Sequence, residues 1–324
     1  MNLKVSTDFL TVKVTTQHPA WPLLRQTPGA SGVWGRYRFV INETVERCDY
    51  WVVCDGLVED ESCVCAPENT LFLTWEPPSG VRPPYSRRFL TQFSAVLTCH
   101  PGLRHRGVRY GQQGHPWFVG KDYDTLTTMD LPGKSLPLVV ISSDKEFAPG
   151  HRDRLFFARA VKEYFGEDAR LVGRGIEDFD DKWDVLAPAR YSVAIENAVC
   201  DDWLTEKLPD CLLAGAFPIY HGAPNVGNYL PDDAFLQIDV RNVQTSLRAI
   251  EDLLSRDDHF ERIQPVLEQA RYHYLQNLQL FPTLAAWLDK LGLPNRTPTI
   301  PVTLRTESAI EGLRVKLQRK FWHP

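Results

Sequence analysis

The sequence lacks the features that mark several large classes of protein. Basic residues are not in excess, because 36 Lys and Arg stand against 41 Asp and Glu and the net charge is −5. A dedicated nucleic-acid-binding protein usually has a strongly basic face, so we expect no nucleic-acid partner. No apolar run approaches the length of a membrane span, and the polar N-terminus does not resemble a signal peptide. These absences predict a soluble, cytoplasmic protein.

Cysteine spacing gives no sign of a disulfide framework or a metal site. The seven cysteines are odd in number and form no CxxC pair, and only Cys63 and Cys65 are close together. Reduced thiols in the cytosol are the simplest interpretation. No Asp-x-Asp pair stands at the end of an expected strand, since Asp178 and Asp180 are expected in a loop. We therefore expect no obligatory metal ion and no other cofactor.

The residues that are present indicate two domains. The 324 residues are enough for two domains of ordinary size, and the 43% that are hydrophobic can build real cores. Apolar strands are expected at 49–54, 69–75 and 94–98, among many prolines. Residues 107–121 look like irregular surface, and residues 130–136 look like a linker.

From residue 138 onward strands and helices alternate, which implies an α/β fold with a parallel sheet. The expected strands lie at 138–141, 169–172, 191–195, 216–220 and 235–238, and the expected helices at 154–165 and 205–214. The chain is mostly helical from about residue 260. We predict domains at 1–132 and 133–300, followed by a basic amphipathic helix at 301–324. That helix would pack on the protein or, as the alternative, make a weak contact with a membrane surface.

Polar side chains stand where elements of the second domain end or begin. Glu196 and Asn197 follow the 191–195 strand, and Thr205, Glu206 and Lys207 begin the next helix. Strand ends and helix starts carry the chemistry of α/β proteins. A nucleotide sugar needs a cation for its diphosphate and acceptors for its hydroxyl groups. These side chains supply both.

Several of these segments resemble the α1,3/4-fucosyltransferases of glycosyltransferase family 10. The segments that are similar to the family signature, in order and spacing, are 173–175, 181–183, 196–197, 203–208 and 213–222. The close resemblance covers about residues 138–245. The first domain is similar only at the turn formed by Glu76, Pro77 and Pro78. Ala198 and Trp203 stand where the family has Ser and Tyr.

The resemblance implies a GT-B architecture, in which two Rossmann-like domains face each other across a cleft. It also implies an oligosaccharide or glycoconjugate acceptor on the first domain and GDP-β-L-fucose on the second. The transfer would invert the anomeric centre, need no metal ion, and reach a hydroxyl group of GlcNAc or glucose through an α1,3 linkage. Two alternatives stay open: another nucleotide-sugar donor, or a catalytically silent protein that binds a sugar nucleotide or glycan. The intact Glu76, Glu206 and Lys207 argue against a silent protein.

Inverting transfer needs a general base, because the acceptor hydroxyl must lose its proton as it attacks. We predict that Glu76 is this base, since it follows a buried strand and precedes two prolines. The resemblance implies the same role for it. Asp55, at the end of the neighbouring strand, is the alternative. Either carboxylate could instead be an ordinary strand-end residue exposed to solvent.

The donor residues are predicted from their charge and position. Lys207 should contact phosphate, where the helix start also favours an anion. Glu206 should accept hydrogen bonds from ribose or sugar hydroxyls, or stabilise oxocarbenium-like charge. Arg154, with Arg152 as the alternative, is expected at the start of a helix and is implied by the resemblance as a diphosphate-binding arginine. Asn197 should bind the sugar or phosphate, or else cap the loop that follows it.

The remaining candidates complete the predicted donor and acceptor sites. Trp203 is predicted to cover the donor, although a buried aromatic residue is more often part of a core. The other candidates in the donor site are Glu196, Gly173 and Arg174. Gly173 is included because glycine permits a close approach of the backbone to a ligand. His115 and Trp117 are predicted to line the acceptor site.

Overall fold

The computed structural model describes residues 9–76, 85–131, 133–146 and 148–311, and the chain divides into two units. Unit 1 comprises Met1–Gln113 and Phe281–Pro324, and unit 2 comprises Gly114–Leu280. This division differs from the predicted domains at 1–132, 133–300 and 301–324. The chain enters unit 2 early because Trp117 and Val119 are buried in its core. It returns to unit 1 early because Phe281 packs edge-on against Phe39, with ring centroids 5.1 Å apart.

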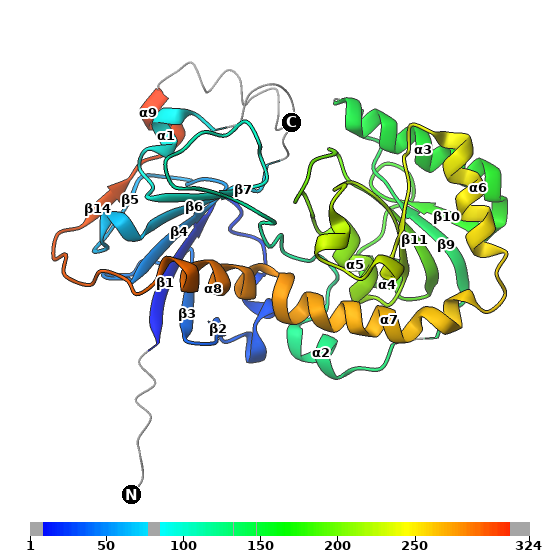
Figure 1. Ribbon diagram of the computed structural model, residues 1–324, viewed down its shortest axis with the longest axis horizontal. Helices are drawn as coiled ribbons and strands as arrows, with labels where there is room; N and C mark the ends of the chain where they lie inside the picture. Colours follow the sequence, from blue (N-terminus) through cyan, green and yellow to red (C-terminus); the bar gives the residue numbers. More distant parts are fainter. Residues whose placement is uncertain (1–8, 77–84, 132, 147, 312–324) are drawn as a thin grey trace, which may run out of the picture. The chain divides into compact units, whose positions relative to one another are not determined.

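A seven-stranded sheet forms the centre of unit 1 (Figure 1). Its order is β2-β3-β1-β4-β6-β7-β8, and every neighbouring pair is parallel except β2 and β3. The strands are β1 (Leu10–Thr16), β2 (Val33–Trp34), β3 (Tyr37–Ile41), β4 (Tyr50–Cys54), β6 (Thr70–Leu73), β7 (Ala95–Thr98) and β8 (Val108–Tyr110). The three strands expected in this part of the chain are confirmed as β4, β6 and β7.

Strand β1 was not predicted, although it lies in the middle of the sheet. Its sequence contains Lys13 and three threonines, so it does not read as an apolar run. The Lys13 ammonium is buried and forms an ion pair with Glu61, with Nζ and Oε2 2.9 Å apart, and donates to the Glu43 carbonyl at 2.8 Å. Tertiary partners therefore allow a polar strand to be central.

The smaller elements of unit 1 join its two chain segments. Strand β14 (Val302–Leu304) pairs antiparallel with β5 (Glu61–Cys63). The helices are α1 (Arg87–Leu90), α8 (Leu280–Leu291) and α9 (Glu307–Glu311), and the 3₁₀ helices are Leu23–Gln26, Pro28–Ala30 and Pro67–Asn69. The predicted helix at 301–324 is thus wrong at its start, which is a strand paired with β5. Residues 312–324, and with them the membrane-contact alternative, lie outside the described residues.

Unit 2 contains a parallel five-stranded sheet of order β10-β9-β11-β12-β13. The strands are β9 (Leu136–Ile141), β10 (Ala169–Val172), β11 (Ala189–Ile195), β12 (Phe217–His221) and β13 (Leu236–Gln237). All five strands predicted from the alternating pattern are confirmed. Figure 1 shows helices α3 and α6 on one face of this sheet and α4 and α5 on the other.

The helices of unit 2 are α2 (Tyr123–Thr128), α3 (Pro149–Phe165), α4 (Lys182–Leu186), α5 (Lys207–Leu213), α6 (Val243–Leu254) and α7 (His259–His273), with a π-helical turn at Tyr274–Leu278 and 3₁₀ helices at Gly166–Asp168, Val226–Asn228 and Asp232–Ala234. Helix α5 begins at Lys207, two residues after its predicted start at residue 205, with Pro209 in its first turn. Helix α3 begins at Pro149 rather than Arg154. In the described part of the chain, no helix has both the length and the apolar character needed to cross a bilayer.

Both sheets have the same connection pattern, in which the chain first adds a strand on one side and then continues on the other. The order reverses between β1 and β4 in unit 1, and between β9 and β11 in unit 2. Open α/β sheets bind ligands at the carboxyl ends of the strands beside such a switch point. The side chains that follow these four strands are therefore the first place to look for a site.

Candidate functional site

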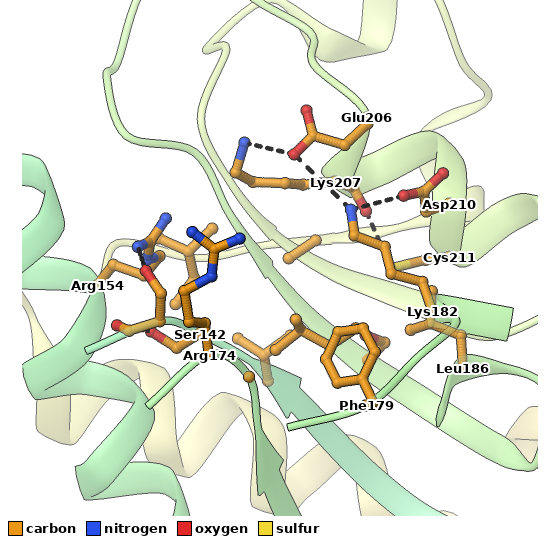
Figure 2. Close-up of a pocket in the computed structure, with 17 residues that line it drawn as sticks. Ser142, Arg154, Arg174, Phe179, Lys182, Leu186, Glu206, Lys207, Asp210 and Cys211 are labelled. Carbon is orange, nitrogen blue, oxygen red and sulfur yellow. Dashed lines mark hydrogen bonds and ion pairs between the residues drawn. The ribbon is translucent and has the colours of Figure 1, made fainter. Parts of the chain in front are cut away.

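A pocket in unit 2 lies at its switch point (Figure 2). The end of β9 contributes Ser142 and Ser143, and β11 contributes Ser192 to Ile195. The charged side chains that line the pocket are Arg154, Arg174, Lys182, Glu206, Lys207 and Asp210. Four of these six are cations, so the pocket is suited to an anion that also carries hydroxyl groups.

Glu196 anchors the start of helix α5. Its side chain is 2% exposed, and it accepts hydrogen bonds from the Thr205 amide at 2.8 Å and from Thr205 Oγ1 at 2.6 Å. Its Oε2 also lies 3.1 Å from Lys207 Nζ. These contacts join Glu196 to Thr205 and Lys207, and Glu196 is absent from the residues that line the pocket. Direct binding of the donor by Glu196 stays a prediction.

Glu206 and Asp210 alternate with Lys207 and Lys182 along one edge of the pocket. Lys207 Nζ lies 3.1 Å from Glu206 Oε1, and Lys182 Nζ lies 3.8 Å from the same oxygen. Lys182 Nζ also lies 2.7 Å from Asp210 Oδ2, and Figure 2 shows this alternation of charge. Asp210 in turn accepts hydrogen bonds from backbone amides of residues 118 and 119. The lysines are thus held in place before a ligand arrives.

The neighbouring charges keep Glu206, Lys207 and Lys182 ionised. Burial alone would raise the pKa of Glu206, but Lys207 and Lys182 hold it well below its usual range. Burial alone would lower the pKa of Lys207, but the carboxylates of Glu196 and Glu206 hold it above its ordinary value. For Lys182, burial is likewise outweighed by Asp210 and Glu206, which raise its pKa. At neutral pH the edge therefore presents two ammonium groups and a carboxylate that can only accept hydrogen bonds.

Arg154 reaches the pocket from the second turn of α3. Its Nη1 donates to Asn197 Oδ1 at 2.6 Å and its Nη2 to Ser143 Oγ at 2.8 Å. The buried Nε has no hydrogen-bond partner among the described residues. Arg152, the alternative, is exposed and donates to the Glu146 carbonyl at 3.1 Å. Of the two arginines, Arg154 lines the pocket, and Asn197 accepts a hydrogen bond from its guanidinium.

The loop after β10 brings the backbone and Arg174 to the same place. Gly173 has a φ of +137°, and a Cβ there would lie 1.7 Å from the Ser142 carbonyl oxygen. Only glycine fits this close approach between the ends of β9 and β10. Arg174 is exposed, and Figure 2 shows its guanidinium near that of Arg154. The predicted positions of both residues at the donor pocket are consistent with this geometry.

The three predicted aromatic contacts fall in unit 2 and are buried. Trp117 is 1% exposed and belongs to the core, so it does not line an acceptor site as predicted. His115 packs edge-on against Trp203, with ring centroids 4.8 Å apart, and therefore lies beside the donor residues rather than in unit 1. Trp203 is also buried, and it is absent from the pocket lining. Sequence reasoning placed residues 107–121 at the surface because it could not see this packing.

The predicted base and its alternative follow neighbouring strands of unit 1. Glu76 follows β6, is half-buried, and its amide donates to the Tyr85 hydroxyl at 3.3 Å. The two prolines after it lie outside the described residues. Asp55 is 1% exposed and accepts hydrogen bonds from Gln17 and Tyr85. Asp55 is therefore less accessible than Glu76, which stays the predicted base.

The sequence reasoning missed several residues of the pocket, among them Lys182, Ser143 and Asp210. Lys182 stands in a segment that was noticed only for its family resemblance, and Ser143 follows β9 without any distinctive pattern. Asp210 carried the clearest signal, because it is a carboxylate within an otherwise apolar helix. A buried carboxylate requires a partner, and that partner is Lys182.

Within the described ranges, no three His, Cys, Asp or Glu side chains gather in a way that could hold a metal ion. Metal independence stays a prediction, which a chelator can test.

A family model matches the second unit. Residues 161–263 match the model described as glycosyltransferase family 10 (fucosyltransferase), C-terminal part. The matched segment contains Lys182, Glu206, Lys207 and Asp210. It begins after Arg154, which is therefore not part of the match. The predicted resemblance to family 10, and the predicted glycosyltransferase class, are therefore confirmed for this part of the chain.

Curated relatives are similar over parts of the chain. A stretch of 169 residues is 33% identical to GDP-fucose protein O-fucosyltransferase 3 of Bos taurus and covers 47% of this chain and 34% of that protein. A stretch of 56 residues is 48% identical to the protein of the same name from Danio rerio and covers 17% of this chain and 12% of that protein. The chain thus spans about a third or less of the length of these relatives.

Solved structures are similar in fold over almost the whole chain. The crystal structure of an α1,3-fucosyltransferase with GDP has a TM-score of 0.52 at 16% identity and covers 92% of this chain and 94% of that one. Another structure of an α1,3-fucosyltransferase gives a TM-score of 0.51 at 15% identity with the same coverage. The predicted fold class, GT-B with two Rossmann-like α/β domains, is confirmed.

Proposed function

We propose that this chain transfers L-fucose from GDP-β-L-fucose to a hydroxyl group of an acceptor. The observation that carries the proposal is the charged pocket at the switch point of unit 2, where Arg154, Lys182 and Lys207 surround one space together with Glu206. Fixed cations stabilise a leaving diphosphate, whose negative charge grows as the glycosidic bond breaks. The match to family 10 and the names of the relatives favour fucose as the sugar.

The reaction is a single displacement with inversion. The acceptor oxygen forms a bond to the anomeric carbon while the bond from that carbon to the phosphate oxygen breaks, and the electron pair leaves with GDP. Glu76 takes the proton of the acceptor hydroxyl. Inversion turns the β-linked donor into an α-linked product.

Each pocket residue has a distinct role in the proposal. Lys207 and Arg154 bind the diphosphate, Arg154 through a guanidinium already fixed by Asn197. Lys182 adds a third cation and keeps Glu206 ionised. The Glu206 carboxylate accepts hydrogen bonds from hydroxyl groups of the ribose or fucose. Because protein carboxylates hold the two lysines in advance and Asn197 holds Arg154, little reorganisation is needed when charge develops on the leaving group.

The acceptor hydroxyl is proposed to belong to a serine or threonine of a protein. The named relatives are protein O-fucosyltransferases, whereas the likeness to the α1,3-fucosyltransferase structures is one of fold. The α1,3 linkage to GlcNAc or glucose, expected from the family resemblance, is the second candidate. Acceptor loops vary freely on a shared scaffold, so an assay must decide between the two.

Two measurements test the proposed function. Thermal shift with GDP, UDP and ADP should show stabilisation by GDP alone, because a ligand that binds the native state raises its stability. Incubation with GDP-fucose should then add one deoxyhexose, seen by mass spectrometry, to a threonine-containing peptide library or to N-acetyllactosamine. Stabilisation by UDP but not by GDP would contradict the proposal that GDP-fucose is the donor. GDP binding without transfer to either probe would favour the silent binding protein.

A further inference from the structure

The switch point of unit 1 holds a histidine–aspartate pair. Strands β1 and β4 are parallel neighbours there, with Thr16 opposite Cys54 at their carboxyl ends. His18 follows β1 and Asp55 follows β4, and His18 Nε2 lies 3.4 Å from Asp55 Oδ2. The pair therefore occupies the position in unit 1 that Ser143 and Asn197 occupy at the switch point of unit 2.

Asp55 is fixed by its surroundings. Its Oδ2 accepts a hydrogen bond from Gln17 Nε2 at 2.6 Å, and its Oδ1 accepts from the Tyr85 hydroxyl and from the Trp75 amide. Its backbone has a φ of +66°, a conformation that non-glycine residues keep only where the surrounding structure imposes it. Burial alone would raise the pKa of Asp55, but the hydrogen bonds from His18, Tyr85 and Gln17 lower it. Asp55 is thus a buried, permanent hydrogen-bond acceptor.

His18, in contrast, reaches the surface. Its side chain is 26% exposed, and its ring stacks on Trp21 with centroids 4.0 Å apart and planes 7° from parallel. Trp21 packs in turn against Trp75, with centroids 5.6 Å apart. The stack and Asp55 together fix the plane of the imidazole. In the tautomer whose Nε2–H donates to Asp55, Nδ1 is the ring's hydrogen-bond acceptor.

We propose that His18, held by Asp55 and stacked on Trp21, binds the acceptor substrate by accepting a hydrogen bond at Nδ1 from an uncharged hydroxyl or amide group. This inference rests on the proposed function, which supplies an acceptor for unit 1. Asp55 is a positioning residue that acts through His18. The switch point of unit 1 then has the same purpose as that of unit 2, with an imidazole and aromatic rings in place of cations.

The test compares acceptor and donor kinetics in variants of the full chain. The probe is whichever of the threonine-containing peptide library and N-acetyllactosamine the wild type fucosylates. His18→Ala should raise the acceptor KM roughly three- to tenfold, the loss expected for one hydrogen bond, and leave the donor KM and GDP affinity unchanged. His18→Asn, whose amide can reach the place of Nδ1, should recover part of the acceptor affinity.

The Asp55→Asn variant tests whether Asp55 affects acceptor binding only through His18. Because Asp55 acts through His18, the double variant His18→Ala/Asp55→Asn should raise the acceptor KM no further than His18→Ala does. Unchanged acceptor KM in an active His18→Ala variant would overturn the assignment of His18 alone. Additive losses in the double variant would overturn the role of Asp55. A wild type that transfers fucose to neither probe would overturn the proposed function, and this inference with it.

Discussion

The two units share one topology but place different chemistry at its switch point. In unit 2, Arg154, Lys182 and Lys207 line the pocket, and protein carboxylates hold the lysines. In unit 1 the corresponding strand ends carry Asp55 and His18, whose ring stacks on Trp21. A shared fold therefore fixes where a ligand binds, whereas the few residues after each strand fix which ligand it is. A diphosphate suits the cations, and an uncharged acceptor suits the imidazole and rings.

The largest expected effect tests whether unit 1 contributes chemistry rather than donor binding. Glu76→Gln keeps the shape of the side chain but removes the proton acceptor. Turnover should fall on the order of 10²–10⁴-fold, while GDP affinity, measured by calorimetry, stays unchanged because the donor pocket lies in unit 2. Turnover close to that of the wild type would show that another group is the base.

Lys207→Ala should affect binding and turnover together. The lost charge-assisted hydrogen bond is worth roughly 1.5–3 kcal/mol, which corresponds to about 10- to 150-fold in GDP affinity. Turnover should fall further, because the leaving phosphate gains charge in the transition state. Lys207→Arg should rescue only partly, since a planar fork does not reproduce a compact ammonium. Initial rates and GDP calorimetry measure both losses.

The Lys207→Ala variant also leaves the buried Glu196 without its ion-pair partner. We expect Lys207→Ala to lower the melting temperature as well. The double variant Lys207→Met/Glu196→Gln removes both charges and should recover stability but not GDP affinity. If it recovered both, the role of Lys207 would be structural, and the contrast between the units would lose its main support.

A matched pair of arginine variants in α3 gives a smaller effect. Arg154→Met should weaken GDP binding about tenfold, as expected for a charged hydrogen-bond donor. Arg152→Met should leave GDP affinity within about twofold, because Arg152 is exposed and is absent from the pocket lining. Equal losses in the two variants would mean that general positive charge, and not the fixed guanidinium, attracts the donor.

The lowered pKa of His151, in unit 2, should make the stability of the protein depend on pH. Burial lowers the pKa of His151 to about 4, and Arg154, Lys145 and Lys207 add to the shift. Between pH 6.5 and pH 4 the unfolded chain then binds a proton that the native protein does not, so stability falls as the pH falls through this window. The loss should be about 1 kcal/mol after discounting for solvent screening. His151→Asn should flatten this part of the stability profile, measured by thermal unfolding.

The smallest expected effect is that of a chelator. Cations of the protein occupy the pocket of unit 2, so EDTA should leave the rate of fucose transfer unchanged. Loss of turnover in EDTA and recovery with manganese would contradict metal independence. It would also mean that the lysines and arginines do not suffice for the diphosphate.

Local signals in the sequence predicted elements that form the pocket of unit 2. The apolar run at 191–195 followed by Glu196 predicted the end of β11, and the predicted start of the next helix at residue 205 lies two residues before the start of α5. These signals are short-range, because a strand end or a first helical turn depends on a few adjacent residues. The contact of Arg154 with Asn197 joins residues 43 positions apart, and here only the family resemblance suggested that the arginine mattered.

The sequence did not predict which of the candidate side chains are buried. Trp117 and Asp55 were predicted to face ligands, and each is 1% exposed. Strand β1 escaped notice because Lys13 makes it look polar, and its ion pair with Glu61 forms between segments far apart in the chain. The sequence does not show whether a polar side chain hydrogen-bonds to water or to another part of the protein. Only the folded structure distinguishes the two.

The sequence by itself determined the α/β class, the five strands of unit 2 and the glycosyltransferase family 10 motifs, because periodicity and motif spacing are local properties. Tertiary structure decided which charges meet. It paired Lys182 with Asp210 and His18 with Asp55, and it divided the chain at residues 113 and 281. Such pairings depend on which strand ends and helices the topology brings together, and that follows from the fold as a whole.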